Sequence, residues 1–302
     1  MKVSVCMITY GHENYIQQAI ESVLKQDCDF DFEIVLSNDC SPDSTDSIIV
    51  DFINENKLVG KIKYFSQKEN IGITPNFVFA VQQCSGEYIA VLDGDDYWTD
   101  PLKLQKQVDF LEAHNDFSGI ATNSLVKYEG STKEHLFKSK LKSKLQTNDL
   151  LESRHFHTAT FMFRKAVFKN DFPKKVLSAD RTLFLLVSCF GSIKLLEDVT
   201  AVYRKNEGGI SRQVTSKQMK LDYVIAKYIK NYNTDFNIYK LKSFISKTVL
   251  DYSHKIYFLD FAKASSLLLY SNFRKKNNVY GKIKSIKHSM KLVVNNFTKI
   301  RL

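Results

Sequence analysis

The densest group of side chains that could do chemistry is the acidic sequence Asp93-Gly94-Asp95-Asp96. It follows the apolar run Tyr88 to Leu92, which is typical of a buried strand. Carboxylates spaced this closely repel one another unless a cation is bound, and a hard divalent ion that bridges to phosphate groups suits such oxygen ligands. Gly94 permits the tight turn that lets Asp93 and Asp95 face one point. The alternative is a solvated acidic turn that caps the next helix.

Other polar residues also stand directly after apolar runs. Thr9 and Tyr10 end the run that begins at Val3, Asp39 follows the run Glu33 to Ser37, and Asn70 precedes Ile71-Gly72. A carboxylate at position 39 can accept the N3–H of a uracil ring, and Asn70 can contact the same nucleotide. Each of them can equally be a turn former without any further role.

An alternation of strand and helix signals must position these residues. The expected strands are Val3–Ile8, Glu33–Ser37, Ile62–Phe65 and Tyr88–Leu92, and the expected helices are Asn14–Lys25, Ser44–Glu55, one opened by Thr74-Pro75, and one from Asp100-Pro101 to about His114. Such repeated units predict an α/β fold with a mostly parallel sheet covered by helices on both faces. Because the carboxyl ends of parallel strands share one edge, we expect the polar residues to converge there.

The rest of the chain is less regular and then strongly basic. Phe156–Arg164 and Ser192–Tyr203 are expected as strands, Ala179–Phe190 as a helix, and 204–212 as a loop. We expect one domain over 1–212 and a helical C-terminal region over 213–302. The formal net charge is +10, and residues 212–302 hold 19 Lys and Arg against four Asp and Glu.

This charge asymmetry predicts an anionic partner for the C-terminal region. An apolar stripe with Lys between its members suits either an anionic membrane surface or packing on preceding helices; its members are Ile283, Ile286, Met290, Val293 or Val294, and Phe297. No nucleic-acid-binding motif is visible, so nucleic acid is not expected. The five scattered cysteines, without a CxxC pair or signal peptide, favour a cytoplasmic location, with peripheral attachment to the inner face of the cell membrane.

The order and spacing of these segments resemble a family-2 glycosyltransferase of the GT-A fold. The similar segments are Val3–Tyr10, Ser37–Asp43, Asn70–Gly72, Gly86–Trp98 and Asp100–Gln107. The resemblance covers 1–115 strongly and 150–212 moderately. It implies a Rossmann-like sheet and the inverting transfer of a sugar from a nucleotide-sugar donor, usually UDP-linked, to an acceptor hydroxyl. The acceptor would be a glycan or lipid-linked glycan of capsule or lipopolysaccharide synthesis.

The resemblance also implies residue roles. Thr9, Tyr10, Asp39 and Asn70 would hold the nucleoside. Asp93 and Asp95 would match the DxD element that holds Mn²⁺ or Mg²⁺ on the diphosphate, with Asp95 the direct ligand. Arg204 or Lys205 would neutralise the diphosphate.

Asp180, in Ser178-Ala179-Asp180-Arg181, would be the base that takes the proton of the acceptor; its alternative is the N-cap of a helix Thr182–Phe190. Trp98 and His157 would line the acceptor side. If His155 and His157 lie on a strand, both side chains share one face.

Two other functions compete with sugar transfer. A nucleotidyltransferase that makes sugar nucleotides should carry a Gly-rich phosphate loop after the first strand, where this chain has Thr-Tyr-Gly-His-Glu-Asn. A non-catalytic protein of the same fold could use its basic tail to dock on membrane, but Asp93, Asp95 and Asp180 argue against it.

Overall fold

The computed structural model describes residues 1–206, 214–252, 255–274, 286–287, 289–291, 293–295 and 300–301. The chain divides into two compact units. Unit 1 comprises Met1–Gln146, Arg154–Lys174 and Ala179–Glu207, and unit 2 comprises Thr147–Ser153, Lys175–Ser178 and Gly208–Leu302.

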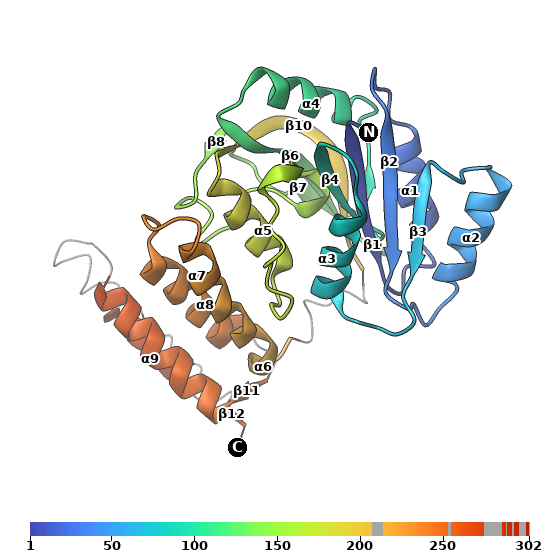
Figure 1. Ribbon diagram of the computed structural model, residues 1–302. Coiled ribbons are helices and arrows are strands. Elements are labelled where there is room, and N and C mark those ends of the chain that lie inside the picture. Colours follow the sequence, from blue (N-terminus) through green and yellow to red (C-terminus); the bar gives the residue numbers. More distant parts are fainter. Residues whose placement is uncertain are drawn as a thin grey trace. The chain divides into compact units, whose positions relative to one another are not determined.

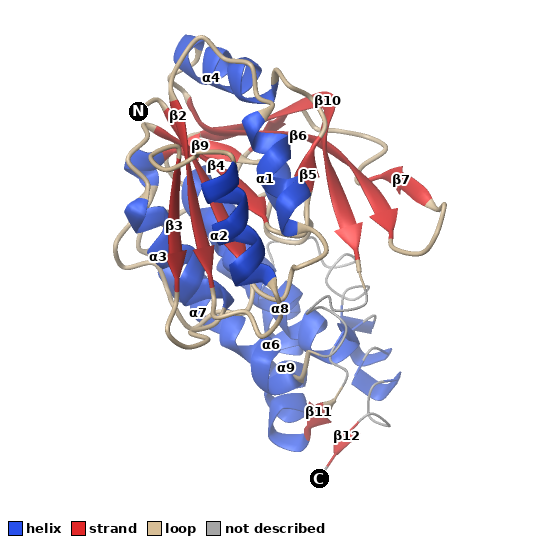
Figure 2. Ribbon diagram, turned by 90° about the vertical axis from the view of Figure 1, so that its right-hand side faces the viewer, coloured by secondary structure: helices blue, strands red, loops and turns tan. Residues whose placement is uncertain are grey.

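Unit 1 is an α/β unit built on one large sheet (Figures 1 and 2). Its strands are β1 (Val3–Thr9), β2 (Phe32–Asn38), β3 (Ile62–Ser66), β4 (Tyr88–Asp93), β5 (Tyr97–Trp98), β6 (Phe117–Tyr128), β7 (Glu134–Leu136), β8 (Lys144–Leu145), β9 (Met162–Arg164) and β10 (Ser192–Lys205). Its α-helices are α1 (Ile16–Leu24), α2 (Thr45–Glu55), α3 (Ile73–Gln83), α4 (Lys103–Ala113) and α5 (Ala179–Ser188).

The sheet has the strand order β3-β2-β1-β4-β9-β6-β10-β5, with β7 paired to β6 and β8 to β10. Strands β3, β2, β1 and β4 run parallel to one another, and so do β6 and β10. The short strand β9 runs antiparallel between β4 and β6 and joins the two parallel parts. In Figure 2, α1 and α2 lie in front of β1 to β4 and α3 lies behind them, so helices cover both faces, as the apolar strands predict.

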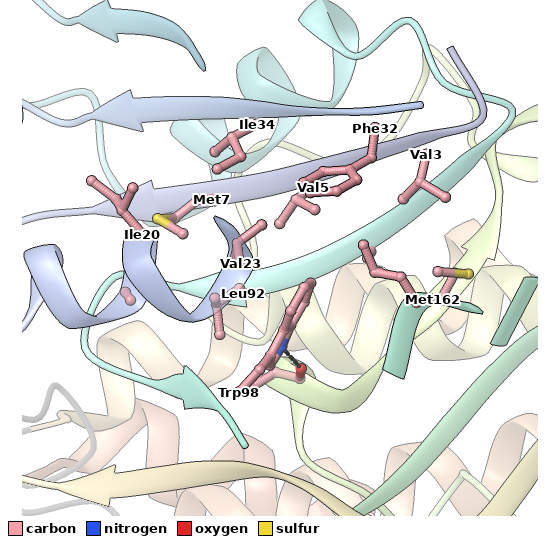
Figure 3. Close-up of a cluster of buried hydrophobic side chains, with 14 of the residues drawn as sticks. Val3, Val5, Met7, Ile20, Val23, Phe32, Ile34, Leu92, Trp98 and Met162 are labelled. Carbon is pink, nitrogen blue, oxygen red and sulfur yellow. Dashed lines mark hydrogen bonds between the residues drawn. The ribbon is translucent and has the colours of Figure 1, made fainter. Parts of the chain in front are cut away.

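The main hydrophobic core lies between the sheet and α1 (Figure 3). Val3, Val5 and Met7 alternate along β1 and point to this side, because successive side chains of a strand face opposite ways. They meet Ile20 and Val23, which α1 presents at helical spacing. Burying such side chains contributes ~1.5–3 kcal/mol each, and this core fixes where β1 ends.

The segment before β9 differs from the expected strand Phe156–Arg164. Only Met162–Arg164 is a strand, and Thr158–Thr160 forms a single 3₁₀ turn. The His157 carbonyl accepts the Thr160 Oγ1–H at 2.8 Å, and its ring Nδ1 accepts the Ala159 N–H at 3.3 Å. These local bonds replace strand hydrogen bonds. His155 and His157 therefore do not share a strand face, and that expectation was wrong.

Two helices begin at other residues than expected. Helix α3 begins at Ile73 after Gly72, whose φ of 92° ends the preceding turn, so Thr74 lies inside the helix and does not cap it. Helix α5 begins at Ala179, so Asp180 lies in its first turn and is not the N-cap of a helix from Thr182.

Unit 2 is mainly helical. Its α-helices are α6 (Ser216–Met219), α7 (Tyr223–Lys230), α8 (Ile238–Tyr252) and α9 (Phe258–Arg274), and its strands β11 (Ile256–Tyr257) and β12 (Ile300–Arg301) pair in parallel. Helices α8 and α9 pack together around Val249, Leu250, Phe261 and Leu268. Within unit 2, the buried Asp260 accepts hydrogen bonds from Ser216 and Lys220, each at 2.8 Å.

The predicted apolar stripe of the C-terminal region lies partly outside the described residues, which include neither Ile283 nor Phe297. Of its described members, Val293 packs against the core of unit 2, whereas Met290 is 56% exposed. A search of the described residues for a helix with the length and apolar character needed to cross a bilayer finds none.

Candidate active site

Parallel pairing aligns the carboxyl ends of β1, β2 and β4. Thr9 pairs with Asn38 and Ile8 pairs with Asp93. Just beyond, the Asp39 N–H donates to the Thr9 carbonyl at 3.0 Å, and the Gly94 N–H donates to the Ile8 carbonyl at 2.9 Å. The structure thus brings the residues after three strands to one edge of the sheet.

The turn after β4 packs directly against the loop after β1. The Asp96 N–H donates to the Asp93 carbonyl at 3.1 Å, which closes the turn. A Cβ at Gly94 would lie 2.6 Å from Thr9 Oγ1 and 3.0 Å from His12 Nδ1. Glycine is therefore required by this close approach, and it allows the acidic turn to sit against Thr9 and His12.

The carboxylates of the turn lie within electrostatic reach of one another and of Asp180. Burial, then the charges of Asp95 and Asp180, raise the pKa of Asp93 to about 7. Burial, then Asp95 and Asp93, raise the pKa of Asp96 well above its ordinary value. Among the described residues, no hydrogen-bond donor contacts the Asp93 carboxylate. Arg154 partly offsets this effect at Asp93 and Arg204 does so at Asp96, but burial and like charges prevail.

Asp96 is the buried end of this cluster. One carboxylate oxygen accepts the Arg204 N–H at 2.9 Å, and the other lies 3.4 Å from His157 Nδ1. The His157 ring is buried and stacks on Tyr203 with centroids 3.8 Å apart. Burial, then the charge of Arg154, lower the pKa of His157 to about 3. Asp96 and His157 therefore connect the acidic turn to Arg204 and Tyr203 of β10.

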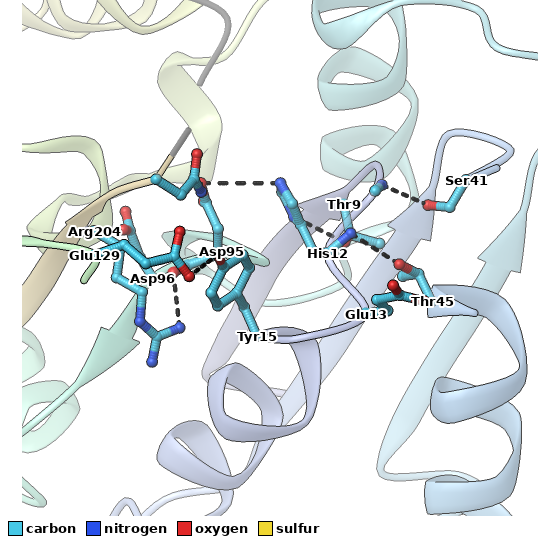
Figure 4. A network of polar contacts seen from close by, with 12 residues as sticks. Thr9, His12, Glu13, Tyr15, Ser41, Thr45, Asp95, Asp96, Glu129 and Arg204 are labelled. Carbon is cyan, nitrogen blue, oxygen red and sulfur yellow. Dashed lines mark hydrogen bonds and ion pairs between the residues drawn. The ribbon is translucent and has the colours of Figure 1, made fainter. Parts of the chain in front are cut away.

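Asp95 is the open end of the cluster (Figure 4). Its Oδ2 accepts a hydrogen bond from Asn206 Nδ2 at 3.1 Å and lies 3.9 Å from His12 Nε2. Its carbonyl accepts a hydrogen bond from Arg204 Nη1 at 3.0 Å. The Asp95 carboxylate is 22% exposed, so a ligand can reach it.

Arg204 is held beside the acidic turn by aromatic rings. Its guanidinium lies 4.5 Å from the centroid of the Tyr97 ring and 5.1 Å from that of Tyr15, a cation–π arrangement. It also donates to Gln18 on α1. The predicted diphosphate residue therefore stands at the acidic turn in a fixed orientation.

Asp39 organises the predicted nucleoside pocket. Its two carboxylate oxygens accept the N–H groups of Ile71 and Gly72 at 2.8 and 2.9 Å, and burial raises its pKa. Asn70 Oδ1 also accepts the Gly72 N–H, at 3.0 Å, which is a turn geometry. Asp39 and Asn70 thus meet in one loop. Tyr10, at the mouth of this edge, is 43% exposed.

Asp180 lies in the first turn of α5. Its Oδ1 accepts the N–H of the next residue, Arg181, at 2.7 Å, and its Oδ2 forms an ion pair with Arg154. Its charge acts on both Asp93 and His157. The predicted base therefore lies in the same electrostatic environment as the acidic turn.

Trp98 has a structural environment unlike that of an acceptor contact. It is 4% exposed and belongs to the main core, and its Nε1–H donates to the Ala159 carbonyl at 2.7 Å (Figure 3). Lys103 Nζ lies 4.1 Å from the centroid of its ring. The indole fixes the turn after β4 from inside and offers no free polar atom. His157 is likewise buried. Neither of the two residues predicted to contact the acceptor, Trp98 and His157, is therefore exposed.

Sequence reasoning missed two residues that the structure places at this edge, because it gave no role to His12 or to Arg154. His12 stands three residues after Thr9, in the loop after the first strand, so the rule used for Thr9 and Tyr10 could have found it. No local pattern marks Arg154.

The site has the hard oxygen donors that a divalent cation prefers, but it has too few protein side chains to hold one alone. Asp93 and Asp95 offer the hard oxygen atoms that Mg²⁺ and Mn²⁺ prefer. Over the described part of the chain, however, no group of three or more His, Cys, Asp and Glu side chains is arranged to hold a metal ion. Any cation here would therefore need ligands from a bound substrate.

Comparison with known proteins identifies the family. Residues 4–172 match the model of glycosyl transferase family 2. The chain belongs to glycosyltransferase family 2. An uncharacterized protein of Mycobacterium tuberculosis is 31% identical over 69% of this chain and 60% of its own length. The poly(ribitol-phosphate) beta-N-acetylglucosaminyltransferase TarS of Staphylococcus aureus is 31% identical over 69% of this chain and 36% of its own. The chain thus spans less than two thirds of these relatives.

Solved structures show the same GT-A fold. The crystal structure of S. aureus TarS 1–349 in complex with UDP-GlcNAc has a TM-score of 0.70 at 22% identity, covering 98% of this chain and 89% of that one. A mannosyltransferase of Pyrobaculum calidifontis, in complex with GDP-Man and Mn²⁺, has a TM-score of 0.59 at 13% identity, covering 97% and 86%. The predicted α/β fold, with its sheet flanked by helices, is confirmed.

Proposed function

We propose that this family-2 glycosyltransferase transfers a sugar, with inversion, from a UDP-linked donor to a hydroxyl group of a bacterial surface glycan. The relatives support this choice, because TarS is named for N-acetylglucosamine transfer to poly(ribitol-phosphate), and GgaB of Bacillus subtilis is named for minor teichoic acid biosynthesis. UDP-GlcNAc is therefore the first donor to test, and teichoic acid, capsule and lipopolysaccharide are the candidate acceptors.

Asp39 would recognise the base of the donor. Each of its carboxylate oxygens accepts one backbone N–H and keeps acceptor capacity for the N3–H of uracil. Thr9, Tyr10 and Asn70 would complete the nucleoside pocket around it. Because Asp39 also holds the turn Asn70–Gly72, its position is fixed before the nucleotide arrives.

Asp95 and Asp93 would hold Mn²⁺ or Mg²⁺, together with oxygens of the diphosphate. The cation would stabilise the negative charge that develops on the leaving UDP. Arg204, held between two tyrosine rings, would add positive charge on the same side. Burial and the neighbouring carboxylates that raise the pKa of Asp93 would be offset once the cation and diphosphate are in place.

Asp180 would take the proton of the acceptor hydroxyl. Inversion requires a base on the face of the sugar opposite the leaving group, and a carboxylate within reach of the acidic turn meets that need. Its Oδ2 is paired with Arg154, so this ion pair must separate, or Oδ1 must act instead. An acceptor that draws Arg154 away would expose the base.

The proposal rests on one observation: the residues that follow β1, β2 and β4, including Thr9, Asp39 and the acidic turn, meet at one edge of the sheet. It is tested by measuring UDP release from UDP-GlcNAc with Mn²⁺ and an acceptor. Asp95→Ala should abolish the release, whereas Asp51→Ala, an exposed carboxylate on α2, should not change it. Release of pyrophosphate from UTP and a sugar phosphate would indicate a nucleotidyltransferase instead, and a chain that binds donor without any turnover would be a binding protein.

A further inference from the structure

The part of the sheet formed by β10, β6 and β7 presents aromatic rings on one face. Tyr203 of β10 pairs with Val126 of β6, which pairs with His135 of β7. Paired residues project from the same face, and so do the residues two positions further along each strand, which here include Tyr128 and Phe137. The rings of Tyr128 and His135 agree with this, since their centroids are 5.8 Å apart. These four aromatic residues, Tyr128, His135, Phe137 and Tyr203, form what we call the aromatic face.

Positive charge lies among these rings. Lys133 Nζ is 5.4 Å from the centroid of the Tyr128 ring, and Lys205 Nζ is 5.4 Å from that of Tyr203. Neither lysine forms an ion pair with any residue in the part of the chain that the structure describes. Both side chains are exposed, so an anion from solution can reach them.

The opposite face of the same strands has balanced charge. Lys127 stands between Val126 and Tyr128 on β6, so its side chain projects the other way. There it forms an ion pair with Glu134 of β7 at 3.6 Å. The lysines without a carboxylate partner are therefore those of the aromatic face.

The outer part of the aromatic face is fixed to β6. The Phe137 N–H donates to the Ser124 carbonyl at 2.8 Å, directly after the end of β7. The buried Asn123 side chain accepts the Lys138 N–H at 3.2 Å and donates to the Lys138 carbonyl at 2.8 Å. The Phe137 ring then lies edge to face against His157, with centroids 5.8 Å apart. These contacts hold the rings in place before any ligand binds.

The inner end of the aromatic face adjoins the candidate active site. The Tyr203 ring stacks on His157, whose Nδ1 is 3.4 Å from Asp96 at the buried end of the acidic turn. The charge of Arg154, the ion-pair partner of Asp180, acts on both of these rings. The Arg154 side chain is 44% exposed, so it is also open to an anion. The aromatic face therefore leads from the surroundings of the candidate base outward along β6 and β7.

We propose that the aromatic face binds the acceptor, and that this acceptor is a polymer of sugar or polyol units joined by phosphate diesters. The inference rests on the proposed function and names the class of its acceptor. The C–H groups of the sugar or polyol units pack on the ring faces, and Lys133 and Lys205 bind phosphate oxygens. A surface on which rings and cations alternate matches a chain in which carbon-rich units and anions alternate. A neutral glycan would leave both lysines without a partner.

Isothermal titration of the full chain with poly(ribitol phosphate) tests this. Wild type should bind this polymer, more weakly as salt is raised, and should not bind dextran, a neutral glucan. Lys133→Gln should raise the Kd for the polymer by ~3-fold, and Lys133→Gln with Tyr128→Leu should raise it by ~10-fold. The Kd for UDP-GlcNAc should not change, because neither residue belongs to the candidate donor site. Lys127→Gln, on the opposite face of β6, is the matched control and should leave both Kd values unchanged.

The outcomes separate this inference from the proposed function. If wild type releases UDP from UDP-GlcNAc but binds dextran as tightly as poly(ribitol phosphate), the acceptor class is refuted and the glycosyltransferase proposal stands. The same holds if Lys127→Gln weakens polymer binding as much as Lys133→Gln does, because the attraction is then general. Equally tight binding of polygalacturonate, a carboxylated glycan, would overturn the choice of phosphate. A chain that neither binds nor cleaves UDP-GlcNAc would overturn the proposed function and, with it, the acceptor role of this face. Lys133→Gln alone is a surface substitution, so it decides the question even if the double variant fails to fold.

Discussion

At the scale of single residues, two buried carboxylates of unit 1 have opposite environments. Burial by itself would raise the pKa of Glu33, but hydrogen bonds from Lys63, Ser4 and Ser85 outweigh it and lower the pKa to about 2. Asp93 has burial and like charges around it instead, and its pKa rises to about 7. The first environment stabilises the charged carboxylate within the fold, whereas the second disfavours its charge, as is common in binding and catalytic sites.

We expect Glu33→Gln to destabilise unit 1 by about 2 kcal/mol above pH 5, because a buried ionised group with several donors loses its charge. The folded-state pKa lies below the unfolded value, so this contribution is fully present above about pH 4.5. It is lost as the pH falls towards 2.

Urea unfolding of wild type and variant across this pH range measures the effect. The difference in unfolding free energy should shrink on acidification, whereas Glu55→Gln, an exposed glutamate on α2, should show none. A difference that does not depend on pH would contradict the charge argument.

For Asp180→Asn we expect retained affinity for UDP-GlcNAc with Mn²⁺ and a fall in kcat of ~100-fold or more, because the proton acceptor is lost while the shape of the side chain is kept. Isothermal titration gives the affinity, and a UDP-release assay gives kcat. Asp109→Asn on α4 is the control, since its carboxylate is exposed. Loss of donor binding in Asp180→Asn would reassign this residue to the donor site.

At the scale of elements, the site depends on where strands end and how closely their loops approach. β1, β2 and β4 end at nearly the same level of the sheet, so the loops that follow them are close together. The turn at Gly94 then fills the space beside Thr9 and His12 with backbone. A helix start contributes Asp180, and β10 contributes Arg204.

We expect Gly94→Ala to displace this turn, since its Cβ would lie 2.6 Å from Thr9 Oγ1. Overpacking of this kind costs ~1–3 kcal/mol, and a lower Tm should report it. Binding of Mn²⁺ with UDP should weaken more than global stability accounts for, because the carboxylates move. Unchanged affinity and Tm would show that the approach is looser than it appears in the structure.

At the scale of the whole molecule, positive charge is concentrated in the C-terminal part of the chain. The formal net charge is +10, and residues 212–302 have a balance of +15, whereas residues 1–211 have a balance of −5. Lys287 and Lys291 are exposed beside Met290, which is also exposed. We predict that these lysines contribute to contact with an anionic membrane surface.

We expect removal of the residues after Asn277 to reduce binding to phosphatidylglycerol vesicles, with wild-type binding itself falling as salt is raised. Because Val293 packs on the core of unit 2, the truncated chain could lose stability. Lys287→Gln with Lys291→Gln leaves that packing intact and should weaken vesicle binding by ~10-fold or more, at ~1 kcal/mol per lysine. If this double variant co-sediments with the vesicles as well as wild type does, the two lysines do not bind membrane, and the C-terminal region serves to pack on unit 2.

Much of the candidate site could be predicted because it follows from local patterns. The apolar runs before Thr9, Asp39 and Asp93 identified three parallel strands, and their shared edge is a consequence of right-handed crossovers. The segment 156–164 could not be read in the same way. Its residues suit a strand, but local bonds from His157 and Thr160 form a turn instead.

What the sequence by itself determined was the family, the order of the strands and helices, and the set of acidic residues at the sheet edge, since strand periodicity and motif spacing are local properties of a chain. Only the tertiary structure decided which side chains surround those carboxylates. Trp98 is buried in the core, Arg154 pairs with Asp180, and His12 faces Asp95. Such contacts join residues far apart in the chain, and packing across the sheet fixes them.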